Sequence, residues 1–470
     1  MSGNAHLLWK ALKGLPRRHG TPWERLRTDL ERFQDTAFGK AHGFSSIRNE
    51  LDFRESIPVS GYDDYSRWID CVAAGERDVL PCGEVLAFER TSGTSGGSKL
   101  IPLTEGLRED FAHGMAAWLE SWKDDCPEAF DGRAYWAISP PGIQGGKTAG
   151  GLSVGLEGDG AYFPERIGEG LAQWLVLPEL SGPATSVFSE TAEKLLETGD
   201  LSLISVWSPT FFLGIDAEVA RLRPGKTWKE IWPKLALLSC WADAASASWI
   251  PEVEKRLGGV RIEPKGLLAT EGITSVPIGG KARLAYESHY HEFLDGEENH
   301  LPMEELQVGT ECEILLSTSG GLMRYRSGDR IRITGFTGNR IPEMRFLGRK
   351  GVMSDLVGEK LSEEFVAHAF VRAGARGFLT ADADAPGYDL WIEEMDRAAG
   401  VLAVVRENPY FRQAVDLGQL APVGTRCLRD GWTMALAVAL ARRQGCRIGD
   451  VKIPVLLKQG YPGEVAEWLG

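Results

Sequence analysis

The sequence predicts an α/β protein with a large N-terminal domain, residues 1–347, in which mixed β-sheets are flanked by helices, and a small α+β C-terminal domain, residues 348–470. Two observations predict this class. From about Leu86 onward, short apolar runs typical of strands alternate with helical stretches and with turns rich in Gly, Ser and Pro. The stretch 348–351, which consists of two glycines and two basic residues, then interrupts the pattern, and a new series of helices and strands follows it. A chain of 470 residues is also too long for one ordinary domain.

Each predicted element follows from the spacing of apolar residues. The first 90 residues are expected to be helical, with an amphipathic pattern over residues 23–38. Apolar runs predict the strands of the large domain at residues 85–88, 100–103, 135–139, 201–206, 235–240 and 313–317. In the small domain the same patterns predict strands at residues 378–381 and 388–393 and helices at residues 361–373 and 434–443.

Composition excludes several classes of protein. The net charge of −14 argues against a general nucleic-acid binder, because affinity for a phosphate backbone needs a basic face. The seven cysteines are scattered and include no C-x-x-C pair, which argues against a disulfide framework or a zinc site and suits a reducing compartment. No signal peptide is visible, and no run reaches the roughly 20 apolar residues of a membrane-spanning helix. We therefore expect a cytoplasmic protein with neither a nucleic-acid nor a membrane partner.

The strongest local motif lies between the first two predicted strands. Residues 91–98 read Thr-Ser-Gly-Thr-Ser-Gly-Gly-Ser, and Lys99 follows them. Glycines let backbone N–H groups approach anionic oxygens, hydroxyls add rotatable donors, and the lysine adds a positive charge. A Walker A loop requires Ser or Thr after its lysine, whereas Leu100 stands here. The alternative is a flexible linker, but linkers rarely separate two strand-like runs. We therefore predict a phosphate-binding loop of another type.

Two acidic residues gain meaning from this loop. Glu271 ends an apolar run, is preceded by Thr270, and could reach a magnesium ion, which usually takes one or two protein carboxylates. Asp329 follows Gly328 in the stretch Tyr-Arg-Ser-Gly-Asp and could accept both hydroxyls of a ribose. Taken singly, each has an ordinary alternative: a surface acid at a strand end for Glu271, and a hairpin-turn Asp with a local backbone bond for Asp329.

Taken together, the three motifs resemble those of the adenylate-forming superfamily. The ordered set is Ser92-Gly93-Thr94-Ser95 with Lys99, then Thr270-Glu271, then Tyr325-Arg326-Ser327-Gly328-Asp329. More closely, the chain resembles the bacterial branch of the acyl-acid amido synthetases named for auxin-responsive promoters. The likeness covers nearly the whole chain. Further stretches that fit this branch lie at residues 36–40, 205–210, 239–243 and 408–412.

The resemblance implies a fold, a reaction and a set of site residues. It implies the adenylate-forming fold and an enzyme that uses ATP and Mg²⁺ to convert a carboxylic acid into an acyl-adenylate, and then passes the acyl group to an amine or amino acid. Glu271, with Thr270, is expected to hold magnesium and to place the α-phosphate, and Asp329 to bind the ribose. Lys99 and Lys452 are the expected catalytic cations, and Arg349 is the expected arginine of the hinge near residues 348–351. The residues expected to hold the phosphates are Ser92, Gly93, Thr94, Ser95 and Lys99.

One departure from the family pattern concerns the adenine base. Relatives often carry an aromatic residue four places before the acid, where this chain has Leu267, which cannot stack on a base. Trp241 is the candidate substitute, and a core tryptophan is the competing interpretation. The acyl pocket is expected to involve Trp207, Thr210 and Phe211, although apolar residues at this spacing are core residues by default.

Two alternatives and one further pair of residues stay open. An acid–thiol ligase would make a coenzyme A or carrier thioester from the same adenylate, and a non-ligase nucleotide-binding protein would hydrolyse or only sense ATP. His289 and His291 would face one side of a strand, but no third metal ligand lies nearby, which favours packing. The sequence does not identify the acid or the amine, because pocket residues come from distant segments.

Overall fold

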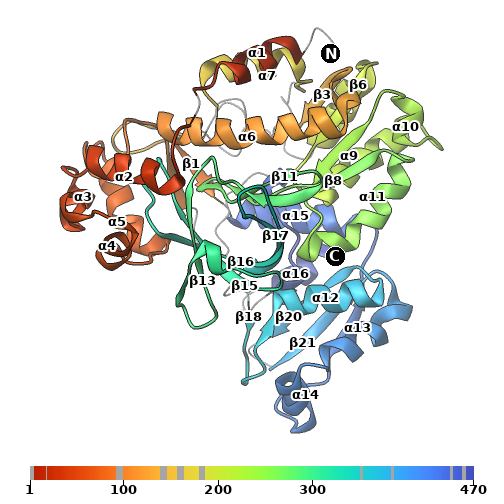
Figure 1. The fold of residues 1–470 in the computed structure, drawn as a ribbon. Coiled ribbons are helices and arrows are strands. Elements are labelled where there is room, and N and C mark those ends of the chain that lie inside the picture. The colour runs from red at the N-terminus through yellow and green to blue at the C-terminus, as the bar shows by residue number, and fades with distance from the viewer. Residues whose placement is uncertain are drawn as a thin grey trace.

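Helices dominate the first 90 residues, as predicted, and strands and helices alternate after them (Figure 1). The computed structural model describes residues 5–16, 18–91, 99–137, 146–155, 163–178, 186–349, 353–382, 386–444, 448–457 and 462–469. The pattern over residues 23–38 does not form one helix, because the Thr36 hydroxyl accepts from the Gly39 N–H and starts a new helix there. The N-terminal helices are α1 (His6–Lys13), α2 (Pro22–Arg32), α3 (Ala37–Ala41), α4 (Glu50–Ser56) and α5 (Tyr62–Ala73).

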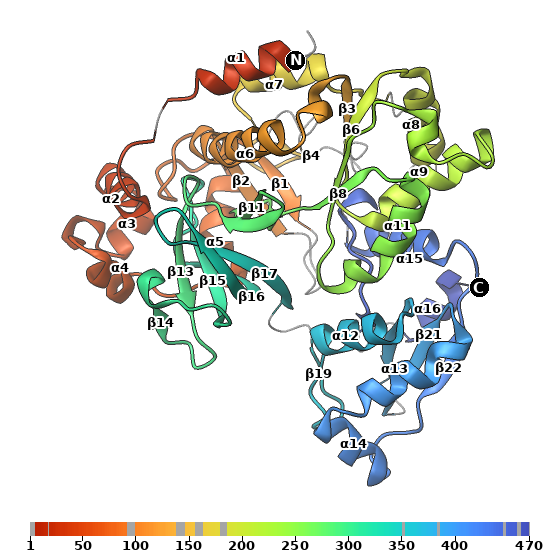
Figure 2. The same ribbon diagram turned by 45° about the vertical axis from the view of Figure 1, so that its right-hand side comes forward.

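The longest helix, α6 (Glu105–Asp125), spans the upper part of the molecule, and α1 and α7 (Glu165–Trp174) lie together above it in both views (Figures 1 and 2). The contact between α1 and α7 is close because a Cβ on Gly170 would stand 2.7 Å from the Leu8 Cα. Buried side chains of all three helices form one apolar core. None of the described helices combines the length and the apolar character needed to cross a membrane.

An antiparallel seven-stranded sheet occupies the centre of the chain. The order is β11-β12-β17-β16-β15-β13-β14, and its longest strand, β16, pairs with β15 on one side and with β17 on the other. Its inward face packs around Ile314, Ile331 and Ile333. The strands are β11 (Ser275–Ile278), β12 (Lys281–Leu284), β13 (Tyr290–Leu294), β14 (His300–Leu301), β15 (Glu311–Ser317), β16 (Tyr325–Thr337) and β17 (Ile341–Arg349).

A second, parallel sheet has the order β3-β6-β7-β8, and its central strands β6 and β7 are buried on both faces, as their nearly continuous apolar runs require. It confirms the strands predicted at residues 201–206 and 235–240. Its strands are β3 (Arg133–Trp136), β6 (Leu201–Ser205), β7 (Leu237–Cys240) and β8 (Arg261–Pro264). The helices around it are α8 (Val187–Glu197), α9 (Pro209–Leu222), α10 (Trp228–Ile231) and α11 (Ile250–Leu257).

The predicted strands on either side of the Ser/Gly loop form an antiparallel hairpin, β1 (Val85–Thr91) and β2 (Lys99–Thr104). Thr91 pairs with Lys99, so the chain leaves and re-enters this sheet at one place. The short strands β5 (Ser153–Val154) and β4 (Gly146–Lys147) complete the sheet. Residues 92–98 themselves, and therefore Ser92, Gly93, Thr94 and Ser95, lie outside the described residues.

The C-terminal part contains a mixed sheet with the order β22-β21-β20-β23, which confirms both strands predicted there. Ser362 starts α12 with a side-chain cap, so residues 361–362 form strand β19 and not the first turn of the predicted helix. The strands are β18 (Met353–Ser354), β19 (Leu361–Ser362), β20 (Gly377–Asp382), β21 (Gly387–Ile392), β22 (Gly424–Cys427) and β23 (Leu456–Leu457). The helices are α12 (Glu363–Ala373), α13 (Ala398–Val405), α14 (Pro409–Asp416), α15 (Trp432–Gln444) and α16 (Pro462–Leu469).

The C-terminal part divides between two apolar cores. Helices α12, α13 and α14 pack with β20 and β21 around Phe370, Leu390 and Val401. Helix α15 instead joins the core of the parallel sheet and lies beside α9 in Figure 2. Trp432 at its start packs against Trp249, with 5.7 Å between the ring centroids and 44° between the ring planes. The division of the chain at residues 347 and 348 stays a prediction, and both α15 and α12 contact elements that precede that boundary.

We expect Tyr65→Phe to lower the free energy of unfolding by about 1–3 kcal/mol. The buried Tyr65 hydroxyl donates to the Met323 carbonyl at 2.7 Å and accepts from the Met323 N–H at 2.8 Å. Its removal leaves both backbone groups of Met323 buried and unsatisfied. Urea unfolding measures the loss, and Tyr410→Phe, at a tyrosine that is 58% exposed, is the control. Equal stability of the two variants would contradict the prediction.

Candidate active site

Asp329 and Arg349 face each other across neighbouring strands β16 and β17. Arg349 Nε lies 2.8 Å from Asp329 Oδ1, and the Ser327 hydroxyl donates to Asp329 Oδ2 at 3.0 Å. Burial would raise the pKa of Asp329, but the charge and hydrogen bond of Arg349, with the charge of Lys452, hold it below its ordinary value. The same pair raises the pKa of Arg349. The carboxylate of Asp329 is therefore ionised and held in place.

A bulge in β16 sets the direction of Asp329. The register between β15 and β16 shifts between Glu313 and Leu315, and three residues of β16, 327–329, fall opposite one residue of β15. Gly328 within the bulge has φ 84°, which disfavours any side chain. Asp329 therefore lies inside a long strand and not in a hairpin turn, which was the alternative interpretation of this residue.

Glu271 occupies the turn between the two-residue strands β9 (Leu268–Ala269) and β10 (Gly272–Ile273). Its side chain is half-buried, and the Tyr325 hydroxyl donates to its Oε1 at 3.4 Å. Burial raises the pKa of Tyr325, and the negative charge of Glu271 raises it further. Thr270 precedes Glu271 in the same turn. Leu267 packs against the core of the seven-stranded sheet.

Lys99 is the first residue of β2, and its ammonium lies 5.2 Å from the centre of the Tyr62 ring. The Tyr62 hydroxyl accepts from the Leu100 N–H at 2.8 Å, which joins α5 to the start of β2. Burial raises the pKa of Tyr62, and Glu271 contributes to this shift, so the carboxylate acts electrostatically on the ring beneath Lys99. Lys99 and Glu271 thus flank the same tyrosine.

Lys452 approaches these residues from the C-terminal part of the chain. Its ammonium lies 4.5 Å from the centre of the Trp241 ring and 5.4 Å from that of Phe346, within the range of cation–π attraction. Solvent reaches the side chain, but loss of hydration around the ammonium, together with the charge of Arg349, lowers the pKa of Lys452 to about 8. Asp329 opposes this shift, which places it within electrostatic reach of Lys452.

The structure brings five of the predicted residues into one neighbourhood. Asp329 contacts Arg349, both act on Lys452, and Glu271 acts on Arg349 as well as on Tyr62 beneath Lys99. These residues come from β2, the β9–β10 turn, β16, β17 and the segment before β23. Negative groups that can bind hydroxyls or a metal therefore alternate with cations that can bind phosphates, an arrangement suited to a nucleotide.

The residues predicted for the acyl pocket lie at or just before the start of α9. The Trp241 ring lies between one of them, Trp207, and Lys452. The Trp207 and Trp241 ring centroids lie 5.8 Å apart, and the backbone N–H of Trp241 donates to the backbone carbonyl of Trp207 at 2.8 Å. Thr210 and Phe211 line a small cavity between α8, α9 and α15, whereas Trp207 does not line it. The half-buried Trp241 ring carries Lys452 on its face, and its predicted adenine contact stays a prediction.

Two features of this region were not predicted from the sequence. Tyr62 carries no motif, and only the fold places it under Lys99. Lys265 is buried, its ammonium 2.6 Å from the Ser205 hydroxyl oxygen. Three tryptophan rings surround it, with centroids 4.6 to 5.3 Å from the nitrogen: Trp118, Trp136 and Trp207. The only sequence signal was its place beside the Glu271 motif.

Comparison with known structures defines the class of this fold. An AtGH3.15 acyl acid amido synthetase solved in complex with 2,4-DB superposes with a TM-score of 0.80 at 19% sequence identity, covering 99% of this chain and 96% of that one. A 2-hydroxyisobutyryl-CoA ligase in the postadenylation state, in complex with R3-HIB-AMP, superposes with a TM-score of 0.54 at 13% identity, covering 99% and 90%. The fold is that of the adenylate-forming ligases, as the resemblance implied.

Sequence comparison gives the family. Residues 21–173 match the GH3 family N-terminal domain, and residues 283–349 match the GH3 family central domain. The indole-3-acetic acid-amido synthetase GH3.3 of Arabidopsis thaliana is 31% identical over 412 residues, which cover 72% of this chain and 68% of that enzyme. The chain belongs to the GH3 family.

Proposed function

We propose that this chain is an ATP-dependent ligase that activates a carboxylic acid as its adenylate and transfers the acyl group to an amine or amino acid, forming an amide. The observation that carries the proposal is the meeting of Lys99, Glu271 and Asp329, from three distant stretches, with Arg349 and Lys452 beside them. Membership in a family whose matched relative is named as an amido synthetase favours an amide over a thioester.

Each proposed role follows from the chemistry of two steps. A carboxylate oxygen bonds to the α-phosphorus of ATP, and pyrophosphate leaves with the electrons of the bond that breaks. The amine nitrogen then bonds to the acyl carbon and loses a proton, and AMP leaves with the electrons of the acyl C–O bond. Lys99 and Lys452 stabilise the negative charge on the phosphates, and Asp329 holds the ribose hydroxyls. The loop Ser92, Gly93, Thr94 and Ser95 is proposed to hold the phosphates.

Magnesium is the second cofactor we propose. Within the described part of the chain, no group of three or more His, Cys, Asp or Glu is arranged to hold a metal ion. An ion that bridges the phosphates of ATP needs only one or two protein carboxylates, and the half-buried Glu271 beside the Thr270 hydroxyl fits that requirement. A magnesium ion bound there would withdraw charge from the phosphate oxygens.

The remaining parts of the proposal concern the setting of the enzyme. We propose small-molecule acid and amine substrates, no nucleic-acid or membrane partner, and a cytoplasmic location. A bacterial origin also stays a proposal, because the relatives described above are from a plant. Residues 348–470 are proposed to turn as a small domain between the two steps, and Arg349 at the end of β17 stands where the turn would begin.

Product analysis tests the proposal against its alternatives. Incubation with a panel of acids, ATP and Mg²⁺ should release AMP and pyrophosphate, and amino acids should yield an amide. Formation of an acyl thioester with coenzyme A and no amide would assign the chain to the acid–thiol ligases. Release of ADP and phosphate, or no turnover with any acid, would contradict the adenylation step itself.

We expect Asp329→Asn to raise the KM for ATP by about 10- to 100-fold, with a smaller effect on kcat. The reason is that the neutral amide loses the charge-assisted bonds that the carboxylate would make to the ribose hydroxyls. Steady-state pyrophosphate release measures both constants. Glu311→Gln is the matched control. Like Asp329, Glu311 pairs with arginine, here Arg330 and Arg332 of β16, but it lies at the surface of β15. An unchanged KM in Asp329→Asn would remove Asp329 from the site.

The pKa of Lys452, about 8, predicts a limb in the pH profile. The lysine is charged below this pKa and neutral above it, so kcat/KM for ATP in pyrophosphate exchange should fall as the pH rises through about 8. Lys452→Arg keeps its charge at higher pH and should move the limb upward. A profile that stays flat to pH 9.5 in the native enzyme would show that the charge of Lys452 is not required.

A further inference from the structure

The hairpin that carries Thr270 and Glu271 consists of two strands of two residues each, so its position depends on contacts with the rest of the protein. Two histidines make such contacts with the backbone of Ile273. The Ile273 N–H donates to His289 Nε2 at 3.0 Å, and His291 Nε2 lies 3.3 Å from the Ile273 carbonyl oxygen. Both backbone polar groups of Ile273 are therefore held by imidazole rings, two residues beyond Glu271.

These contacts determine the tautomers of the two histidines. A ring nitrogen that accepts from an N–H carries no proton, so His289 has its proton on Nδ1. A carbonyl only accepts, so His291 donates from Nε2. Burial and the neighbouring His289 lower the pKa of His291 to about 3, which keeps that ring neutral. The predicted packing of these two residues thus takes the form of directed hydrogen bonds.

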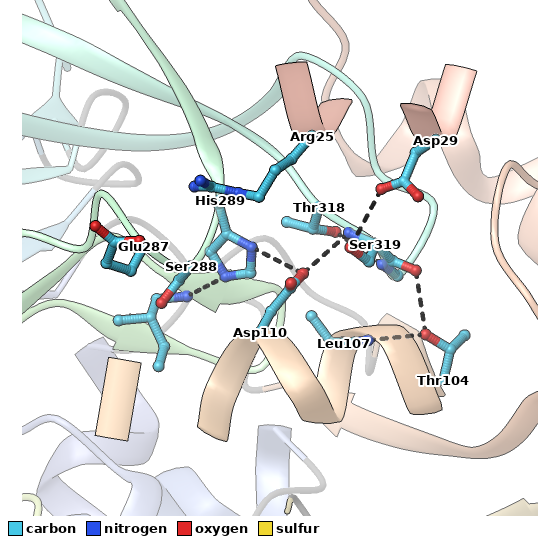
Figure 3. A network of polar contacts seen from close by, with 12 residues as sticks. Arg25, Asp29, Thr104, Leu107, Asp110, Glu287, Ser288, His289, Thr318 and Ser319 are labelled. Atoms are coloured by element: carbon cyan, nitrogen blue, oxygen red, sulfur yellow. Dashed lines mark hydrogen bonds and ion pairs between the residues drawn. The ribbon is translucent and has the colours of Figure 1, made fainter. Parts of the chain in front are cut away.

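Asp110, on α6, faces the protonated nitrogen of His289. His289 Nδ1 lies 3.2 Å from Asp110 Oδ2, and the same carboxylate accepts from the Ser319 N–H at 3.1 Å (Figure 3). The carboxylate also pairs with Arg18. Asp110 is only 1% exposed. Burial would raise its pKa, but the contacts with His289 and Arg18 hold it below the ordinary value. A fixed carboxylate therefore lies beside the ring whose far nitrogen holds the hairpin.

Close packing leaves the His289 ring no freedom on the hairpin side. A Cβ on Gly272, the residue after Glu271, would stand 2.9 Å from His289 Nε2. On the helix side, a Cβ on Gly114 of α6 would stand 2.7 Å from Ile273 Cδ1 and 2.8 Å from the Ser288 hydroxyl oxygen. Helix, ring and hairpin meet at two glycines, so a displacement of the ring is transmitted to the Glu271 turn.

We propose that Asp110 and His289 are positioning residues, which act through the Ile273 backbone to hold the Glu271 carboxylate in its place beside the Tyr325 hydroxyl. The inference rests on the proposed role of Glu271. A purely stabilising role explains the pair less well, because a buried ionic group contributes little more to stability than apolar residues of the same volume. His289 also bonds to the backbone of the hairpin, which fixes its position directly.

Two amide variants test the contacts of the two imidazole nitrogens of His289 one at a time. In His289→Gln the amide oxygen stands near the place of Nε2 and can accept from the Ile273 N–H. In His289→Asn the amide group stands near Nδ1, where it can donate to Asp110 but cannot reach Ile273. Hydrogen exchange of the peptide spanning residues 265–278, which needs no activity, should show native protection in the Gln variant and about 10-fold or greater loss of protection in the Asn variant.

Pyrophosphate exchange is measured on the same samples. The expected kcat is within about threefold of the native value in the Gln variant and about 10- to 100-fold lower in the Asn variant, with KM for the acid unchanged in both. Tyr388→Phe is the control for lost buried bonds, since Tyr388 donates to Ser354 at 2.7 Å far from this hairpin, and it should retain native kcat. If the Asn variant does not fold, Gly272→Ala, which displaces the ring, replaces it.

The two readouts keep the outcomes distinct. Equal protection of the hairpin in the Gln and Asn variants would overturn the positioning role, whatever the activity. Native kcat in the Asn variant despite a loosened hairpin would overturn the link to Glu271. If the native protein shows no pyrophosphate exchange with any acid, the proposed function fails. The hydrogen-exchange comparison of the two variants still decides whether His289 holds the hairpin.

Discussion

In Glu271→Gln, ATP–pyrophosphate exchange should fall by about 10²- to 10³-fold, which corresponds to about 3–4 kcal/mol of lost transition-state stabilisation. The side chain keeps its size but loses the negative charge with which Glu271 would bind a magnesium ion and position the α-phosphate. Stability should change little, because Glu271 is half-buried in a turn and its described hydrogen bond, from the Tyr325 hydroxyl, is long at 3.4 Å. A low rate with an intact fold is therefore the expected result.

Tyr325→Phe provides the matched control for this variant. It removes the hydroxyl that contacts Glu271 but leaves the carboxylate, so exchange should fall by less than about tenfold. The magnesium concentration for half-maximal rate should rise in Glu271→Gln and stay near the native value in Tyr325→Phe. If both variants lose activity equally, or if Glu271→Gln retains the native rate, Glu271 does not hold the metal.

Lys452→Met should reduce adenylation by about 10²- to 10³-fold and leave the reaction of a preformed acyl-adenylate with the amine within about tenfold of the native rate. The methionine keeps an unbranched, apolar stem beside Trp241 and Phe346 but removes the charge. That charge is needed most in adenylation, where negative charge develops on the departing pyrophosphate, whereas in the second step only the single phosphate of the departing AMP gains charge. The two half-reactions should therefore separate in this variant.

Lys123→Met tests whether the effect belongs to this lysine. Lys123 also lies over a tryptophan, 5.5 Å from the centre of the Trp9 ring, but on α6 and away from the candidate site. It should retain native rates in both half-reactions. Equal loss of both half-reactions in Lys452→Met would indicate damage to the fold or to substrate binding, and native adenylation would exclude Lys452 from catalysis.

The regular elements could be predicted because their apolar periodicity matches the final burial. The runs at residues 201–206 and 235–240 are continuous and apolar, and they form parallel strands buried on both faces. Side-chain caps were harder to weigh against periodicity, so the predicted helix at residues 361–373 began two residues too early, before the Ser362 cap. The alternative of a hairpin turn at Asp329 was wrong, because a bulge keeps the strand continuous through Gly328.

The candidate site could be predicted only as separate motifs. Lys99, Glu271 and Asp329 each stand in a recognisable motif, whereas Arg349 and Lys452 were expected from the family resemblance. The fold places these residues together. Tyr62 could not be found in this way, and His289 could be predicted only as a packing residue, because their partners are set by packing between α5, α6 and the β9–β10 hairpin. Packing of this kind has no local sequence signal.

A crystal structure with a non-hydrolysable acyl-adenylate analogue would test directly whether Glu271, Asp329 and Lys452 bind one nucleotide. The account predicts that Asp329 accepts hydrogen bonds from both ribose hydroxyls, that the phosphate mimic lies beside Thr270 and Glu271, and that Lys452 reaches it from the C-terminal part of the chain. An analogue bound elsewhere, with Asp329 paired only to Arg349 and no ligand beside Glu271, would contradict it.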